Sequence, residues 1–209
     1  MPHINVAQGT PEWHEARKGI LTASNVASAA GLKGAYDSRT ALWKSLNGLV
    51  VKEVTAPMMY GTEHEENARH DGEIAIGRLS WPVGIFVHPE FDWLGASPDG
   101  LLGKTALHEI KCRPENPYKD VPSHHMAQVQ IQLACAGYPE CYYQSWTPDE
   151  HRIWLIKINQ DYVNWLFPFL TEFWGYVTTH EEPPRLSRKR SYTEPLPYEL
   201  IYEGKTYGV

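Results

Sequence analysis

Three polar residues whose types suit phosphate chemistry lie within the stretch "SPDGLLGKTALHEIKCR" (97–113): Asp99, Glu109 and Lys111. The two carboxylates offer the hard oxygen ligands that Mg²⁺ prefers, and this ion keeps water ligands that a substrate phosphate can displace. A lysine beside them would direct the attacking water and offset the charge that develops in the transition state. These residue types therefore predict metal-dependent hydrolysis of a phosphodiester.

The local sequence indicates how these side chains meet. Because side chains alternate along an extended strand, Glu109 and Lys111 in "TALHEIKC" lie on the same face. Asp99 lies in "SPDG", whose proline and glycine favour a turn, and a hairpin built on that turn would bring Asp99 toward Glu109. Short patterns of this kind also match unrelated chains by accident, so the neighbouring elements must support the interpretation.

Length and composition bound the domain organisation. The chain has 209 residues, of which 42% are hydrophobic, and this is enough for one compact domain. We predict a single domain over 1–180 and a tail over 181–209 that is rich in proline and charge, including a solvated basic run "RLSRKR" (185–190). The net charge of -6 argues against a protein that coats nucleic acid, but it leaves room for a local basic channel.

Hydrophobic runs also bear on where the protein is found. No run of about 18 apolar residues is present to cross a bilayer, and the start "MPHINVAQGTPEW" lacks a secretory pattern. We therefore expect a soluble, intracellular protein with no membrane association.

Periodicity and turn signals predict an alternation of helices and strands. Helices are expected over 10–19, 22–31, 37–48, 61–77, 123–137 and 160–180. Strands are expected over 83–89, 92–97, 105–112, 141–146 and 152–158, with the first three forming a meander. The pattern predicts an α/β (α+β) fold in which helices flank a central mixed sheet.

Four sequence blocks together resemble a known family. They are "WHEARKGILTASNV" (13–26), "GTEHEENAR" (61–69), "SPDGLL…HEIKC" (97–112) and "HMAQVQIQ" (125–132), in the family's order. They resemble the phage lambda-type exonucleases, or YqaJ-like viral recombinases, within the PD-(D/E)XK nuclease superfamily, and prophage-encoded alkaline recombination exonucleases in particular. The resemblance covers most of the chain to about residue 160 and implies a restriction-endonuclease-like core.

The resemblance implies roles for individual residues at the predicted catalytic site. By matching position, the metal ligands are the carboxylates of Asp99 and Glu109 and the main-chain carbonyl of Ile110. Lys111 matches the catalytic lysine, Glu65 a helix-borne acid that faces the same site, and Gln128 an active-site glutamine.

Two neighbours of Glu65 are less well defined by the family pattern. Glu66 is an alternative to Glu65, although a helix would point it about 100° away. His64 matches no ligand of the nearest family block, so we expect at most an indirect contact with the site. Outside the matched block, Gln128 would be read as a solvated helix residue.

The first block bears on the choice of substrate. Arg17 and Ser24 match residues with which the family holds a 5′-terminal phosphate. Their chemistry agrees, because an arginine offers a planar fork to phosphate oxygens, and Ser24 begins a predicted helix whose free N–H groups favour an anion. Trp13 also matches, but a tryptophan on an amphipathic helix is usually a core residue.

By resemblance, the protein is expected to be a Mg²⁺-dependent exonuclease, with Mn²⁺ as a substitute ion. It would degrade the 5′-ended strand of double-stranded DNA, 5′ to 3′, into mononucleotides and leave 3′ overhangs for a single-strand annealing protein. A toroidal homotrimer in the cytoplasm of a bacterial host, encoded by a phage or prophage, is also implied. Two alternatives remain: a restriction-type or structure-specific endonuclease, and a non-catalytic module that binds DNA ends.

Overall fold

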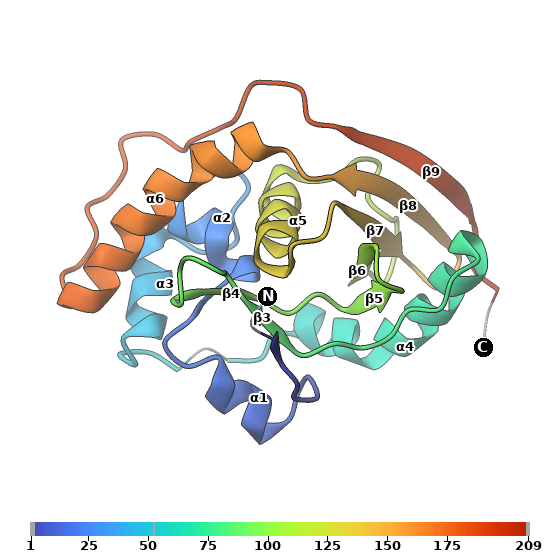
Figure 1. Ribbon diagram of the computed structural model, residues 1–209, viewed down its shortest axis with the longest axis horizontal. Helices are drawn as coiled ribbons and strands as arrows, with labels where there is room; N and C mark the ends of the chain where they lie inside the picture. The colour runs from blue at the N-terminus through green and yellow to red at the C-terminus, as the bar shows by residue number, and fades with distance from the viewer. Residues whose placement is uncertain (1–2, 52, 208–209) are drawn as a thin grey trace.

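The computed structural model describes residues 3–51 and 53–207, whose strands form two sheets with helices packed around them (Figure 1). The four-stranded sheet has the order β1 (His3–Ile4), β3 (Ile85–Val87), β4 (Leu94–Ala96), β2 (Leu21–Thr22). The five-stranded sheet has the order β5 (Gly100–Leu102), β6 (Ala106–Cys112), β7 (Glu140–Trp146), β8 (Glu150–Lys157), β9 (Tyr198–Lys205). The expected combination of mixed sheets and flanking helices is confirmed.

Six α-helices and one 3₁₀ turn occur in the described residues. They are α1 (Pro11–Ala16), the 3₁₀ turn η1 (Ala23–Asn25), α2 (Val26–Ala29), α3 (Arg39–Leu46), α4 (Ala56–Ile76), α5 (Ser123–Ala136) and α6 (Gln160–Thr179). Helix α4 packs along β6, whereas α5 contacts β3 and β4 of one sheet and β7 of the other. Among these helices, none combines the length and the apolar character needed to cross a membrane.

The predicted meander of three strands is wrong. Strands β3 and β4 pair with each other in the four-stranded sheet, but β6 lies in the five-stranded sheet, where it pairs with β5 and β7. The "SPDG" segment links the two sheets, and the hairpin turn comes later, around Gly103, whose φ of 67° favours glycine. The element that brings Asp99 back toward Glu109 is therefore β5, a strand that the sequence analysis missed.

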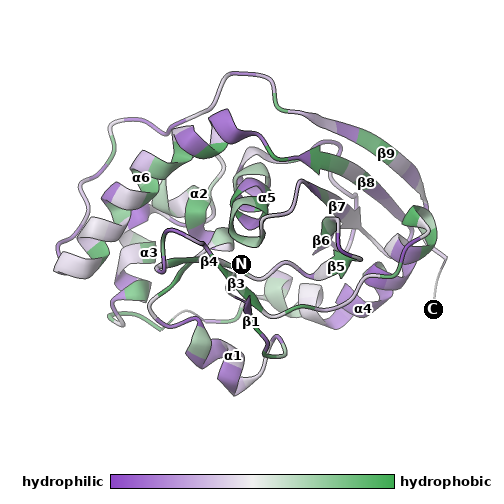
Figure 2. Ribbon diagram, viewed as in Figure 1, coloured by the Kyte–Doolittle hydropathy of each residue, from purple (hydrophilic) through white to green (hydrophobic). Residues whose placement is uncertain are grey.

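Helix α5 positions a buried face over the five-stranded sheet. Strands β6 and β7 run parallel, with Glu109 opposite Tyr143, and α5 forms the crossover that a parallel pair requires. Of its 14 residues, 11 are buried, and Figure 2 shows more hydrophobic colours on α5 than on the mostly hydrophilic α4. Polar side chains on α5 are therefore enclosed, which makes the solvated interpretation of Gln128 wrong.

Part of the C-terminal segment is ordered against the body of the protein. Strand β9 pairs with β8. Upstream of it, Arg190 forms two main-chain hydrogen bonds with the loop after α2: its N–H donates to the Gly31 carbonyl (3.0 Å), and its carbonyl accepts from the Lys33 N–H (2.9 Å). The Arg190 guanidinium donates to the Ala30 carbonyl at 2.7 Å and lies 4.1 Å from the centre of the Phe169 ring.

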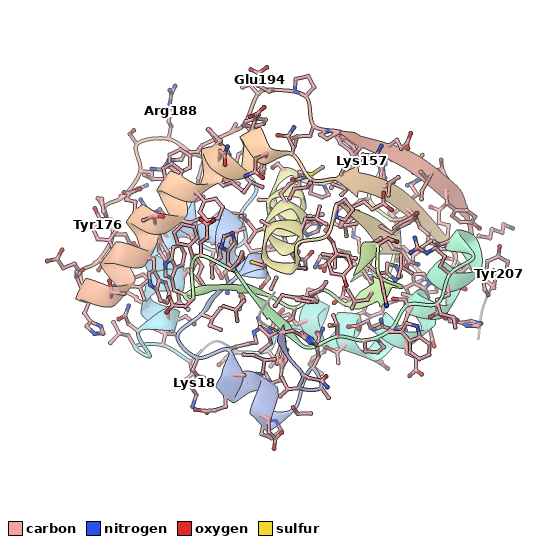
Figure 3. The ribbon with its side chains drawn as sticks, viewed as in Figure 1. Lys18, Lys157, Tyr176, Arg188, Glu194 and Tyr207 are labelled. Carbon is pink, nitrogen blue, oxygen red and sulfur yellow. The ribbon has the colours of Figure 1, made fainter. Side chains whose placement is uncertain are left out.

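Two arginines of the basic run 185–190 therefore differ in their surroundings. Arg188 is exposed and points away from the body in Figure 3, as the solvated interpretation predicts. That interpretation is wrong for Arg190, because local sequence gives no sign of partners some 160 residues away.

Replacing Arg190 with Ala should lower the free energy of unfolding by roughly 1–2 kcal/mol, because it removes a charge-assisted hydrogen bond and a cation–π contact. Urea denaturation measures this change. Arg188→Ala, at the exposed position in the same run, is the matched control and should leave stability unchanged. Equal stability of the two variants would show that the Arg190 side chain does not hold the segment.

Candidate active site

Asp99 and Glu109 lie side by side, as predicted. Antiparallel pairing of β5 and β6 places Gly100 opposite His108, so Asp99 comes next to Glu109 and Ile110. The Oδ2 atom of Asp99 accepts a hydrogen bond of 2.6 Å from the Ile110 main-chain N–H. Glu109 itself is 1% exposed, so its charge requires partners within the protein.

The Glu109 carboxylate is held by three donors. Its Oε1 accepts from the Lys111 ammonium and from the Gln128 side-chain amide, each at 2.6 Å. Its Oε2 accepts from the Gln132 amide, also at 2.6 Å. The contact with Lys111 confirms that Glu109 and Lys111 share one face of the strand.

Gln132 is a neighbour of Glu109 that the sequence analysis missed. It lies four residues after Gln128 on α5, and side chains at this spacing project from the same helix face. The i, i+4 spacing of the two glutamines on one helix was the available signal. Together the two amides fix the orientation of the Glu109 carboxylate.

Arg69 joins Glu65 to the site. Its guanidinium donates from Nη2 to Glu65 Oε1 at 2.6 Å and from Nη1 to the main-chain carbonyl of Asp99 at 2.6 Å. The structure therefore brings Glu65 to the same corner as the carboxylate pair. The sequence analysis did not name Arg69, although its i, i+4 spacing from Glu65 is typical of an ion pair on a helix.

His64 and Glu66, the two neighbours of Glu65, have different surroundings. Glu66 is exposed on α4, on the wall of the adjoining cleft. The His64 ring packs between two aromatic rings, with centroid distances of 4.2 Å to Tyr60 and 5.7 Å to Trp146. These contacts give His64 a packing role.

The site carries an excess of negative charge. Burial raises the pKa of the Asp99 carboxyl well above its usual range, and the charges of Glu109 and Glu65 raise it further. Burial also raises the pKa of Glu65, against the charge of Arg69. For Lys111, burial alone would lower the pKa, but the charges of Glu109 and Asp99 outweigh it and raise the pKa above the ordinary value. Three acids, Asp99, Glu109 and Glu65, thus meet two cations, Lys111 and Arg69, and the remaining negative charge favours a further cation.

The donor set fits a hard divalent ion. A carboxylate offers about four lone-pair positions, and the hydrogen bonds to Glu109 use three, two on Oε1 and one on Oε2. Oε2 thus keeps one position, and the hydrogen bond to Asp99 engages only its Oδ2. In the described ranges no three His, Cys, Asp or Glu side chains are grouped to hold an ion. Mg²⁺ needs few protein ligands, since it usually keeps several waters beside one or two carboxylates. The Ile110 carbonyl remains a predicted ligand.

A cleft of about 890 Å³ adjoins this corner. Glu65 and Arg69 line one side of it, and Trp13 and Trp81 line another. Trp13 is half-buried and donates from Nε1 to Ser97 Oγ at 3.2 Å, so its interpretation as a core residue is wrong.

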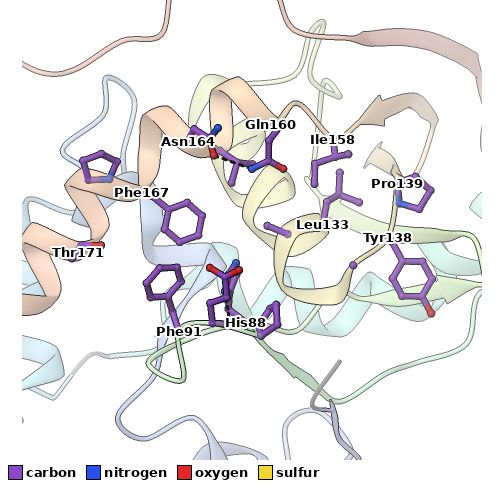
Figure 4. Close-up of a pocket in the computed structure, with 16 residues that line it drawn as sticks. His88, Phe91, Leu133, Tyr138, Pro139, Ile158, Gln160, Asn164, Phe167 and Thr171 are labelled. Carbon is purple, nitrogen blue, oxygen red and sulfur yellow. Dashed lines mark hydrogen bonds between the residues drawn. The ribbon is translucent and has the colours of Figure 1, made fainter.

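A second cleft of about 890 Å³ lies elsewhere, between α5, α6 and the 88–91 loop (Figure 4). None of the predicted site residues lines it. It therefore has no part in the chemistry of the carboxylate pair.

Arg17 stacks on Trp13, one of the residues that line the cleft. Its guanidinium lies 3.8 Å from the centre of the Trp13 ring, and Trp13 bonds to Ser97, two residues before Asp99. Burial lowers the pKa of Arg17 to about 10, so the side chain remains cationic at neutral pH. Trp13 therefore links a cation to the segment that carries Asp99.

Ser24 approaches the same segment by strand pairing. Strand β2 runs parallel to β4 with Thr22 opposite Gly95, so Ser24 and Ser97 both lie two residues beyond that pair. The predicted helix start is wrong, because Ser24 lies within the 3₁₀ turn and the helix that follows has only four residues. Ser24 offers an exposed hydroxyl, 3.1 Å from Thr22 Oγ1, rather than the end of a long helix.

A buried polar network fixes α4 against the sheet behind the site. The His108 ring lies 3.0 Å from Ser80 Oγ and 3.0 Å from Gln144 Oε1, and the Gln144 amide donates to the Ala68 carbonyl at 2.8 Å. Helix α4 comes so close that a Cβ at Gly72 would lie 2.4 Å from Gln144 Oε1. The absence of a side chain at Gly72 permits this approach, and the hydrogen bond from Gln144 to Ala68 holds the helix that carries Glu65.

Because burial lowers the pKa of His108 to about 3, acid should destabilise the protein through this residue. In the unfolded chain this histidine takes up a proton below about pH 6.5, whereas in the folded chain it stays neutral until about pH 3. The stability that the neutral His108 contributes is therefore lost as the pH falls below about 6.5. Between about pH 7.5 and about pH 5.5, wild type should lose about 1.4 kcal/mol more than His108→Gln. Urea denaturation at both pH values tests this, and an equal loss in both proteins would contradict a neutral His108.

Comparisons with known proteins concern the family and the fold. The family model described as "YqaJ-like viral recombinase domain" matches residues 12–139. The crystal structure of an alkaline exonuclease (LHK-Exo) from Laribacter hongkongensis superimposes with a TM-score of 0.69 at 29% identity, covering 82% of this chain and 94% of that one. No curated protein matches the sequence.

Two further solved structures are similar. LHK-Exo in complex with dAMP has a TM-score of 0.69 at 27% identity and the same coverage. A phage-related exonuclease from Haemophilus somnus 129PT has a TM-score of 0.58 at 11% identity, covering 77% of this chain and 94% of that one, and this likeness concerns the fold alone.

The fold and the Pro98–Asp99 and Glu109–Ile110–Lys111 pattern define the class: a mixed α+β nuclease with a PD-(D/E)XK core. Since the family model spans more than half of the sequence, the chain belongs to the YqaJ-like viral recombinase family. That membership and the likeness to an alkaline exonuclease make the protein a nuclease.

Proposed function

We propose that this nuclease is a Mg²⁺-dependent exonuclease that degrades the 5′-ended strand of double-stranded DNA from its end. The observation that carries the proposal is the Glu109 carboxylate, buried beside Asp99 and held by Lys111 at 2.6 Å. Mn²⁺ would substitute, since it accepts the same oxygen ligands.

The protein's own groups have distinct tasks in this proposal. Asp99 and Glu109 would hold the ion, which supplies polarisation of the scissile phosphate when bound. Lys111 would orient the attacking water and offset negative charge on the phosphate. Gln128 and Gln132 keep Glu109 in place, while Glu65, steadied by Arg69, is available to hold the water or take its proton.

Selection of a 5′ end would depend on Arg17 and Ser24. Both are brought toward the segment that carries Asp99, Arg17 through Trp13 and Ser24 through the pairing of β2 with β4. An arginine fork and a hydroxyl are suitable donors for a terminal phosphate. Arg17 and Ser24 would bind the terminal phosphate of the strand, and this contact would be independent of the base sequence.

Arg17→Ala should abolish the preference for 5′-phosphorylated ends, because the cation that binds the phosphate is removed. The ratio of initial rates on 5′-phosphate and 5′-hydroxyl duplexes measures it. Lys18→Ala, at the exposed neighbouring position, is the matched control and should keep the preference. Equal degradation of 5′-phosphate and 5′-hydroxyl ends by the wild type would contradict a 5′-phosphate site at Arg17 and Ser24.

Mononucleotides are the proposed products, leaving 3′ overhangs. The similar LHK-Exo has been crystallised with dAMP, a deoxynucleoside monophosphate, which supports this product class. Family membership supports a partner that anneals single strands, encoded by the same phage or prophage, and action in the bacterial cytoplasm. A toroidal homotrimer would let a chain of net charge -6 stay on DNA, because a ring holds the duplex by enclosure.

The direct experiment uses a linear duplex labelled at one 5′ or one 3′ end. With Mg²⁺, the 5′ label should be released first as a mononucleotide, and closed circular DNA should stay intact. Early release of the 3′ label would contradict the polarity. Nicking of the closed circle would instead identify a restriction-type or structure-specific endonuclease.

A further inference from the structure

We propose that Tyr36 is a substrate-contacting residue whose hydroxyl donates a hydrogen bond to the phosphodiester beside Lys111. The proposal rests on the nuclease function given above. Tyr36 lies in the loop between α2 and α3 and is 71% exposed, yet its hydroxyl lies 2.7 Å from His125 Nε2. An exposed aromatic residue with a fixed polar end is suited to meeting a ligand.

The position of the Tyr36 hydroxyl is set by a buried relay. His125, 1% exposed on α5, places its Nδ1 2.6 Å from the hydroxyl of Tyr143, which is fully buried on β7. Tyr143 is the partner of Glu109 in the parallel pair of β6 and β7. The same two elements that hold Glu109 thus also hold Tyr36.

Hydrogen-bond accounting gives the relay a direction. Within the described chain, the Tyr143 hydroxyl has one hydrogen bond, to His125 Nδ1, and a buried hydroxyl proton needs an acceptor. Tyr143 therefore donates to Nδ1, and His125 carries its proton on Nε2 and donates it to the Tyr36 oxygen. The Tyr36 hydroxyl then keeps its own proton, which the neighbouring Tyr118 side chain accepts in the free protein and which a phosphate oxygen would accept in its place.

The charges around Tyr36 suit an anion. Burial, the charge of Tyr118 and a hydrogen bond with the Tyr118 side chain raise the pKa of Tyr36 to about 12, against the charge of Lys111, so the hydroxyl stays protonated. The guanidinium of Arg113, which also acts on Tyr36, lies 4.3 Å from the centre of the Tyr118 ring. A phosphate held at Lys111 would therefore meet two cations and a neutral donor.

Two contacts favour a phosphate over a stacked base. The Tyr36 ring meets the His124 ring edge to face, 4.7 Å between centroids at 81°, so its orientation is already set by a neighbour. The loop before it is pinned by the main-chain hydrogen bonds between Arg190 and residues 31 and 33. These contacts hold the Tyr36 hydroxyl in one position, and a hydroxyl held in this way can bind a phosphate oxygen in one defined geometry.

Tyr36→Phe should lower kcat on a 5′-phosphorylated duplex by about tenfold, the effect of one lost hydrogen bond, with KM unchanged. Tyr138→Phe, on the separate cleft of Figure 4, is the matched control and should keep full activity. His125→Gln should lower kcat in the same direction, because it removes the donor that orients Tyr36.

A phosphorothioate at the scissile linkage separates contact from packing. If Tyr36 touches a non-bridging oxygen, sulfur at that oxygen should make Tyr36→Phe and wild type nearly equal, while the other diastereomer keeps the tenfold difference. Full activity of Tyr36→Phe, or the same loss on both diastereomers, would overturn the contact. Unchanged cleavage by Lys111→Ala run alongside would instead overturn the proposed nuclease site.

Discussion

Lys111→Ala should lower kcat by about a hundredfold or more while leaving the affinity for duplex DNA ends nearly unchanged. The Lys111 ammonium lies 2.6 Å from the Glu109 carboxylate, and the acids around it keep its pKa above the ordinary value, so it is a fixed positive charge. In the proposed mechanism its removal takes away a preorganised donor that would act on the transition state. Single-turnover cleavage and an equilibrium binding assay measure the two quantities separately.

Lys104→Ala is the control for this variant, because Lys104 is an exposed lysine in the turn of the same hairpin. Circular dichroism should confirm that both variants fold, since Lys111 also compensates a buried carboxylate. Should Lys111→Ala cleave DNA at close to the wild-type rate, Lys111 is not the catalytic lysine.

Asp99→Asn should lower kcat by about a thousandfold, the equivalent of several kcal/mol of lost metal-dependent stabilisation. Asparagine keeps an oxygen that can accept the 2.6 Å hydrogen bond from the Ile110 N–H, so the fold should persist. What it loses is the charge that would bind the ion. A raised Mg²⁺ requirement, measured by titrating the ion into a cleavage assay, should accompany the loss.

The control for this second variant is Asp92→Asn, an exposed aspartate near the end of the 88–92 loop, which should retain activity and Mg²⁺ dependence. Wild-type turnover by Asp99→Asn at low Mg²⁺ would remove Asp99 from the ligand set.

The parts of the site that follow local rules were predictable from sequence. Strand alternation correctly placed Glu109 and Lys111 on one face. The proximity of Asp99 to Glu109 was also predicted correctly, but from a turn at Asp99, whereas the hairpin turn lies around Gly103. The family blocks added Glu65 and Gln128, which the structure brings to the same corner.

The parts that depend on distant contacts were not predictable from local pattern. Gln132 acquires its role only when α5 brings it to Glu109, and Arg69 only when α4 packs on β6 and brings it to the Asp99 carbonyl. Tyr36 acquires its role only when its loop meets α5. Strand β9 was missed for a related reason. Six of its eight residues are exposed, so the sequence lacks the regular alternation that marks a half-buried strand, and pairing with β8 defines it.

The most direct test of the central claim is anomalous diffraction from a crystal soaked in Mn²⁺. We predict a peak about 2.1 Å from carboxylate oxygens of both Asp99 and Glu109, at the lone-pair position that the two glutamines and Lys111 leave on Glu109. The peak should vanish in Asp99→Asn. A soaked wild-type crystal with no ion between these two carboxylates, or with the two groups turned apart, would contradict the account.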